Sequence, residues 1–233
     1  MFVSLSLDAY MFSSREVFLF QKNMRRINIV ILLCILSSVF FWFISPEEFG
    51  IVFNYFVFSG DNLLQGKVWT PVTALFLHAD LLHLAGNMLF LFVFGNTLEE
   101  EIGPKRTLAA FFSGGILSFL FSLFFYAPQT PMIGASAAIF TLTSIVMLVK
   151  PLRFSIFFLM PQGLVAILYF MYNVVAVYYG SQGNVAFISH IIGFIVGIPM
   201  GIGWSREWKK NLFITFGLLL LFYILQVLLQ QIL

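Results

Sequence analysis

Charged side chains are scarce in this sequence, where they make up 9% of the 233 residues, against roughly 25% in ordinary soluble domains. Hydrophobic residues account for 61% of the chain. This composition excludes an ordinary soluble domain and predicts a polytopic integral membrane protein. The few basic residues are scattered, so we expect no nucleic-acid partner. The sequence also lacks metal-binding and nucleotide-binding motifs, and we expect no cofactor and no metal.

Cysteine is nearly absent as well. The single cysteine, Cys34, lies in the first long apolar run, so an intrachain disulfide is excluded. The N-terminus has no basic region ahead of an apolar one, which is not the pattern of a signal peptide.

Several apolar runs reach the roughly 17 to 25 residues that a membrane-spanning helix needs. They show no strand-like alternation, and backbone groups in lipid must bond internally, so we predict helices. The fold class is therefore an all-α polytopic membrane protein with seven spans. They are expected at about 27–44, 82–97, 106–126, 134–149, 162–180, 186–204 and 211–231.

The remaining segments are connections and a tail. Residues 1–26 are predicted to form a cytoplasmic tail, and the connection 45–81 to be long, irregular and membrane-associated. With the tail in the cytoplasm, eleven of the twelve lysines and arginines fall on the cytoplasmic side, and only Lys67 lies outside. The positive-inside rule supports this orientation. It is the topology expected of a protein of the cell membrane.

Three spans that run in the same direction carry polar residues near their outer ends. His83 and Asn87 begin the second span, Ser136 begins the fourth, and His190 lies about one turn into the sixth. At about 1.5 Å of rise per residue, these positions share one shallow layer. Ionisable groups inside a membrane mark function. A hydroxyl and a base are the minimum equipment for nucleophilic catalysis.

Small residues indicate how two of these spans meet. One face of the sixth span carries a histidine and three glycines, namely His190, Gly193, Gly197 and Gly201. The fourth span begins with Gly134-Ala135-Ser136, another surface without bulk. Such faces let helix backbones approach closely, which would bring His190 beside Ser136. The alternative is that both are packing motifs with an incidental serine.

The pair in the second span also has two interpretations. His83 and Asn87 lie four residues apart and so project from one helix face. They could hold the bundle together by interhelical hydrogen bonds, worth roughly 1 kcal/mol each, or donate to a developing oxyanion. His78 precedes the span, nearer the surface, and is expected to organise the loop.

Together these motifs resemble those of the rhomboid intramembrane serine proteases, in the order that this family shows. The matching segments are His83-Leu84-Ala85-Gly86-Asn87, Gly134-Ala135-Ser136 and His190-Ile191-Ile192-Gly193. The resemblance covers residues 50–204. Ala137 departs from it, because many members have glycine after the serine. A six-span rhomboid core at 27–204 followed by a seventh C-terminal helix within 205–233 is the organisation that the resemblance implies.

The resemblance also implies roles for the residues. Ser136 would be the nucleophile and His190 its general base, acting as a dyad without a carboxylate. Phe140 would stack on His190, and Gly134, Gly193 and Gly197 would support the site. His83, Asn87 and the Ser136 backbone N–H would form the oxyanion hole.

The implied substrates are transmembrane helices of other proteins in the lipid bilayer, cleaved near the outer membrane face. The fifth span, or the loop with Gly180 and Gly183, is a candidate gate. A catalytically inactive rhomboid-like protein that binds membrane clients is the main alternative. A transporter with a histidine proton relay is disfavoured because the spans lack carboxylates.

Overall fold

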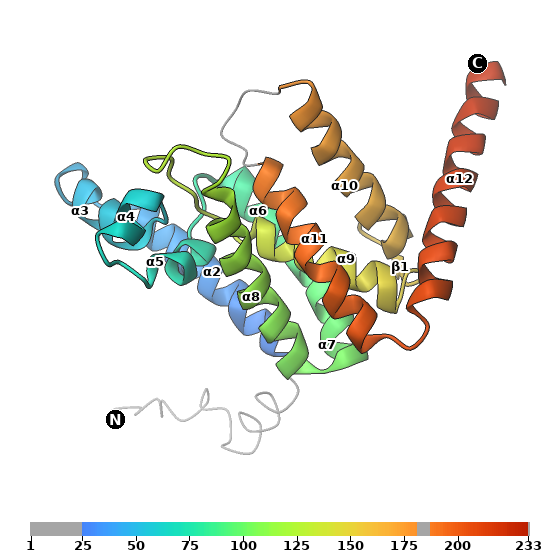
Figure 1. Cartoon of the computed structure of the whole chain (residues 1–233), viewed down its shortest axis with the longest axis horizontal. Helices are drawn as coiled ribbons and strands as arrows, with labels where there is room; N and C mark the ends of the chain where they lie inside the picture. The colour runs from blue at the N-terminus through green and yellow to red at the C-terminus, as the bar shows by residue number, and fades with distance from the viewer. Residues whose placement is uncertain (1–24, 181–186, 233) are drawn as a thin grey trace, which may run out of the picture.

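The computed structural model describes residues 25–180 and 187–232, and these form a mostly helical bundle (Figure 1). Residues 1–24 of the predicted tail and Gly183 lie outside the described residues. The long apolar helical segments are α2 (Arg26–Trp42), α6 (Leu81–Phe90), η2 (Leu91–Gly95), α7 (Asn96–Ile102), α8 (Pro104–Ser122), α9 (Ser136–Val149), α10 (Gln162–Tyr178), α11 (Phe187–Trp204) and α12 (Trp208–Ile232).

Six of the seven predicted spans each overlap one of these helices. The second predicted span overlaps three segments that follow one another directly, α6, η2 and α7. Within residues 25–180 and 187–232, three helices are long and apolar enough to cross a membrane by length and composition, namely Leu81–Ile102, Phe187–Trp204 and Trp208–Gln231. Three shorter apolar helices are Arg26–Trp42, Ser136–Val149 and Gln162–Tyr178. Several apolar helices of this kind indicate an integral membrane protein.

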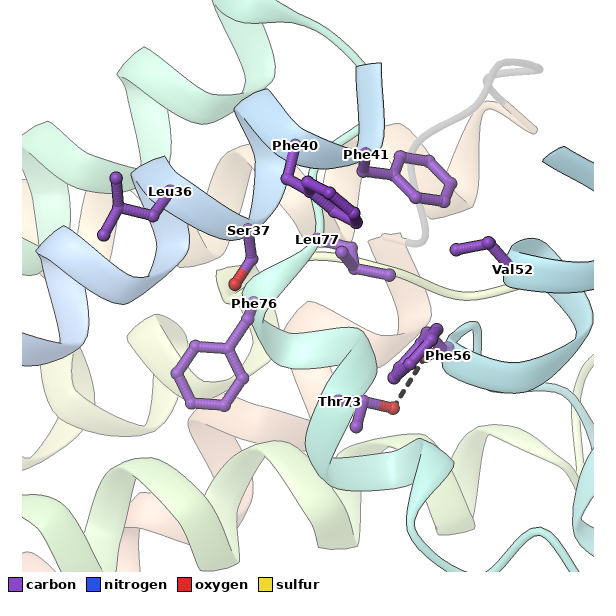
Figure 2. Close-up of a pocket in the computed structure, with 9 residues that line it drawn as sticks. All are labelled: Leu36, Ser37, Phe40, Phe41, Val52, Phe56, Thr73, Phe76 and Leu77. Carbon is purple, nitrogen blue, oxygen red and sulfur yellow. Dashed lines mark hydrogen bonds between the residues drawn. The ribbon is translucent and has the colours of Figure 1, made fainter. Parts of the chain in front are cut away.

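The connection 45–81 was predicted to be irregular, and this is wrong for much of its length. It contains α3 (Pro46–Phe56), α4 (Gly60–Leu64), α5 (Thr70–Thr73) and the 3-10 helix η1 (Ala74–Phe76). Local capping explains these short helices, because the side chains of Ser45 and Ser59 accept the backbone N–H of the third residue on, at the starts of α3 and α4. Between α2, α3 and the segment 73–77 lies an apolar hollow of about 390 Å³ (Figure 2).

The helix α9 is the centre of the bundle. Every residue from Ala137 to Leu148 is buried, and α8, α10, α11 and α12 all pack against it. Most of these residues are apolar, and the hydroxyls of Thr141, Thr143 and Ser144 donate to backbone carbonyls, so the helix can be buried on all sides. Burial of α9 fixes the position of its first residue, Ser136, relative to the surrounding helices.

The glycine face of α11 packs directly on α9. A side chain at Gly193 would overlap the backbone carbonyl of Ala137, and one at Gly197 would overlap Ser144 and the Thr141 carbonyl. The Thr141 hydroxyl also donates to the Gly193 carbonyl at 2.8 Å. The predicted close contact between these two helices is therefore present.

Charged side chains join several helix ends at the opposite end of α9 from Ser136. Glu100 of α7 pairs with Arg25, which precedes α2, and with Arg153, which follows α9, both at 2.9 Å. Lys150 pairs with Glu101 at 3.0 Å. Beyond Arg153, the two-residue strands β1 (Phe154–Ser155) and β2 (Met160–Pro161) form a small antiparallel hairpin that leads into α10.

Candidate active site

Ser136 and His190 meet at the start of α9. Ser136 is the first residue of α9, and His190 lies in the first turn of α11. The Ser136 Oγ and His190 Nε2 atoms are 2.8 Å apart, within hydrogen-bond distance. His190 is buried, whereas Ser136 is partly exposed. The glycine face of α11 makes this contact possible, since it admits the backbone of α9 one turn further along.

The other parts of the His190 ring are also in contact. Phe140 lies one helical turn after Ser136, and its ring stacks on the imidazole with centroids 4.7 Å apart and planes at 10°. Tyr169 of α10 stacks against Phe140 in turn, at 4.5 Å. The Nδ1 atom of His190 is 2.7 Å from the Oδ1 atom of Asn173 in α10.

Sequence reasoning missed Asn173. The predicted spans contain no carboxylate that could orient His190, and an amide was not expected in that role. The sequence did carry a signal, because Asn173 is an amide inside the apolar run 162–180 and polar groups within membrane helices mark sites. In the structure Asn173 is 1% exposed.

His83 and Asn87 lie beside the backbone that leads into Ser136. Gly134 adopts a φ of 110°, which favours glycine. A side chain there would come within 2.9 Å of the His83 ring and 3.7 Å of the Asn87 Nδ2 atom. That Nδ2 atom is buried and has no hydrogen-bond partner within the described part of the chain. A buried donor without a partner is costly, so it needs an explanation, and a catalytic role is one.

His78, which was expected to organise the loop, is fully buried. Its Nδ1 atom is 3.0 Å from the Ser38 hydroxyl, and its Nε2 atom accepts the Ala135 N–H at 3.4 Å. Burial, with a smaller contribution from His83, lowers the pKa of His78 to about 3, so its ring is neutral at pH 7. The connection 45–81 folds back between α2 and Ala135, and His78 joins those two segments.

These side chains are suited to nucleophilic attack on a carbonyl group. A hydroxyl bonded to an imidazole nitrogen can lose its proton as it attacks a carbonyl carbon. Amide and imidazole donors close to that hydroxyl can stabilise the resulting oxyanion. Across residues 25–180 and 187–232, no group of three or more His, Cys, Asp and Glu side chains is arranged to hold a metal ion.

Comparison with known proteins shows which family this chain resembles. The Rhomboid domain family matches residues 65–207. The chain is 25% identical over 188 residues to RHOMBOID-like protein 12, mitochondrial, of Arabidopsis thaliana, covering 72% of this chain and 54% of that one. It is 30% identical over 125 residues to the Putative rhomboid protease YdcA of Bacillus subtilis, covering 53% and 63%.

A third relative is the Rhomboid protease GlpG of Yersinia enterocolitica, which is 26% identical over 188 residues, covering 78% of this chain and 63% of that one. The chain thus spans between about half and two thirds of the length of these relatives. The family match covers more than half of this chain and includes all four helices that carry the site, namely α6, α9, α10 and α11. The chain therefore belongs to the rhomboid family of integral membrane proteins.

Proposed function

We propose that this protein is an intramembrane serine endopeptidase in which Ser136 is the nucleophile and His190 the general base. The observation that carries the proposal is the 2.8 Å contact between the Ser136 Oγ and His190 Nε2 atoms. Relatives named as rhomboid proteases support the same activity.

The reaction follows from this contact. The Ser136 oxygen attacks the scissile carbonyl carbon while its proton passes to His190 Nε2. The tetrahedral intermediate then collapses, the C–N bond breaks, and His190 returns the proton to the leaving amine. Water, deprotonated by His190, hydrolyses the acyl-enzyme and releases Ser136. Stacking on Phe140 keeps the His190 ring in plane through these steps.

The negative charge of the intermediate needs donors near Ser136. We assign this role to the Asn87 amide, the His83 ring and the Ser136 backbone N–H. The unpartnered Nδ2 atom of Asn87 supports the assignment, because a preorganised donor has no other bond to give up when the oxyanion forms. Gly134 supports the arrangement by leaving no side chain between these groups and the nucleophile.

For the membrane arrangement, we propose that six helical segments within 27–204 cross the bilayer as the rhomboid core and that α12 crosses as a seventh. The pairing of Arg25, Arg153 and Lys150 with Glu100 and Glu101 gathers basic residues at one end of the bundle. Under the positive-inside rule that end is cytoplasmic. The site then faces outward, and we assign the protein to the cell membrane.

The proposed substrates are transmembrane helices of other membrane proteins, cut near the outer face. A helix keeps its amide groups bonded internally, so the cleaved segment must leave helical geometry before Ser136 can reach its carbonyl. We expect substrates with helix-destabilising residues near the cut and a small residue at the cut.

The test is cleavage of a transmembrane substrate panel by the protein reconstituted in liposomes. We expect wild type to cleave, and Ser136→Ala and His190→Ala each to abolish cleavage. Ser113→Ala is the matched control, because Ser113 is a serine of α8 that bonds only to the Ala109 carbonyl of its own helix. Its activity should equal that of wild type.

Two outcomes would contradict the proposal. Undiminished cleavage by Ser136→Ala would show that another group is the nucleophile. A wild type that cleaves no member of a broad panel, and whose Ser136 does not react with a fluorophosphonate, would favour the inactive client-binding alternative. The retained contact between Ser136 and His190 argues against that alternative.

A further inference from the structure

The His190 ring is held on the side opposite Ser136 by a residue of a third helix. Asn173 of α10 places its Oδ1 atom 2.7 Å from His190 Nδ1, and both residues are buried. Two aromatic side chains also contact the ring. Phe140 covers one face, and Phe187 approaches edge-on with centroids 6.4 Å apart. Within the described residues, Asn173 is thus the polar side chain that bonds Nδ1.

The orientation of the Asn173 amide follows from its second bond. Its Nδ2 atom donates to the Tyr169 backbone carbonyl at 2.8 Å. A carbonyl oxygen can only accept, so the amide atom that faces it must be the NH₂ group. The atom that faces His190 is then the amide oxygen, which can only accept.

This oxygen determines where the imidazole carries its proton. Because Oδ1 accepts, Nδ1 must bear the hydrogen, and in a neutral ring Nε2 is then bare. The bare Nε2 atom faces Ser136 Oγ at 2.8 Å, so the hydroxyl donates to it. That is the tautomer a general base requires, and the opposite tautomer would direct an N–H at the nucleophile.

We propose that Asn173 is a positioning residue for the base, so that the site is a Ser136–His190–Asn173 triad and not a dyad. The inference rests on the proposed function for its kinetic consequence, although the tautomer that it assigns is a property of the resting protein. Asn173 acts through His190 and does not touch the substrate.

The three residues of the triad come from three different helices, so their contacts depend on how these helices pack. Ser136 and His190 come from α9 and α11, which are locked together by the glycine face. Asn173 comes from α10, whose last turns, from Val174 to Tyr178, are largely exposed. A displacement of α10 away from α11 would break the Asn173 bond while leaving Ser136 and His190 in contact. The state of the base therefore depends on the position of α10.

The primary variant is Asn173→Leu, which keeps a similar side-chain volume and removes the acceptor. We expect kcat to fall roughly 10- to 100-fold, a part of the roughly 10²–10⁴-fold that a positioned general base contributes. KM should stay unchanged. Asn173→Asp keeps an acceptor oxygen for Nδ1–H and should recover most of the lost kcat.

The matched control is Gln162→Leu. This variant also replaces a buried amide of α10 by leucine, but at the first residue of the helix, directly after β2. It should leave kcat at the wild-type value. Melting temperatures of all variants in detergent separate a loss of folding from a loss of positioning.

The second readout is independent of cleavage. Nitrogen-15 NMR of protein labelled at histidine, with His190 assigned by comparison with His190→Gln, reports which ring nitrogen is protonated. We expect a single Nδ1–H tautomer in wild type and Gln162→Leu, and loss of that single tautomer in Asn173→Leu.

The outcomes are distinct. An Nε2–H tautomer in wild type, or the same tautomer and kcat in Asn173→Leu as in wild type, would overturn the triad. If wild type cleaves no substrate but shows the Nδ1–H tautomer that Asn173→Leu loses, the proposed function fails while the assignment of Asn173 as the orienting group stands.

Discussion

Gly193 lies against the backbone carbonyl of Ala137 with no room for a methyl group between them. This contact joins α11 to α9 one turn beyond the pair of Ser136 and His190. The group that faces Gly193 is the Ala137 backbone carbonyl and not the Ala137 side chain.

Substituting Gly193 should therefore lower the rate of cleavage, although the atoms nearest to the added side chain belong to neither Ser136 nor His190. In Gly193→Ala the added methyl group would force α11 away from α9 and lengthen the contact between Ser136 and His190. A displacement of about 1 Å can cost about 10²-fold in rate, and we expect a loss of cleavage of that order. Gly203→Ala, on the same helix but with open space around the added carbon, is the control and should cleave normally. Full activity of Gly193→Ala would disprove this account of the helix contact.

Asn87→Ala should impair catalysis without destabilising the fold. Loss of one oxyanion donor costs roughly 10²–10³-fold in kcat. Because the Asn87 Nδ2 atom has no partner in the described residues, its removal should leave the melting temperature unchanged or raise it, since an unsatisfied buried donor is itself unfavourable. Cleavage kinetics and thermal unfolding in detergent measure the two effects. A large fall in melting temperature with unchanged kcat would instead assign Asn87 to helix packing.

His78 should make stability depend on pH in a predictable direction. Burial lowers its pKa to about 3, whereas the unfolded chain takes up a proton near the ordinary value of about 6.5. Below that value the unfolded state binds more protons, so stability is fully present above about pH 6.5 and is lost as the pH falls towards 3.

The measurement compares wild type with His78→Asn, which lacks the titrating ring. Between pH 7.5 and pH 5, wild type should lose about 2 kcal/mol more of its free energy of unfolding than the variant. Urea unfolding in detergent at several pH values gives both curves. Parallel curves would mean that His78 is not held neutral by burial.

The proposed orientation can be tested by cysteine accessibility. Cys34 is buried, and Cys34→Ser provides a background without thiols. In that background we expect Lys67→Cys to react with a membrane-impermeant maleimide added to intact cells. Lys105→Cys should react only after the membrane is opened. The reverse pattern would place the site on the cytoplasmic side.

Much of this protein could be predicted from its sequence because the relevant information is local. The apolar runs located the helices to within a few residues, since a span in lipid must satisfy its own backbone. Helical spacing placed His190 on a face with Gly193 and Gly197, and that face packs on α9. The pairing of Ser136 with His190 was expected from this arrangement, and the structure brings the two together.

Other features depend on contacts between distant segments. The short helices of 45–81 are an exception, because the caps at Ser45 and Ser59 bond only three residues ahead, and this local signal was present in the sequence although the segment was predicted to be irregular. The burial of His78 could not be predicted, since it depends on Ser38, forty residues earlier in the chain, and on Ala135.

The sequence by itself determined the class of this protein, the positions of its helices and the identity of the serine and the histidine, since composition and helical periodicity are properties of adjacent residues. Only the tertiary structure decided how the histidine is oriented. Asn173 is an isolated amide in an apolar run, which marks it as a candidate site residue, but the residues around it along the chain do not show which side chain it meets. It reaches His190 because α9 lies at the centre of the bundle and α10 and α11 both pack against it, so that one ring is bonded from two helices at once.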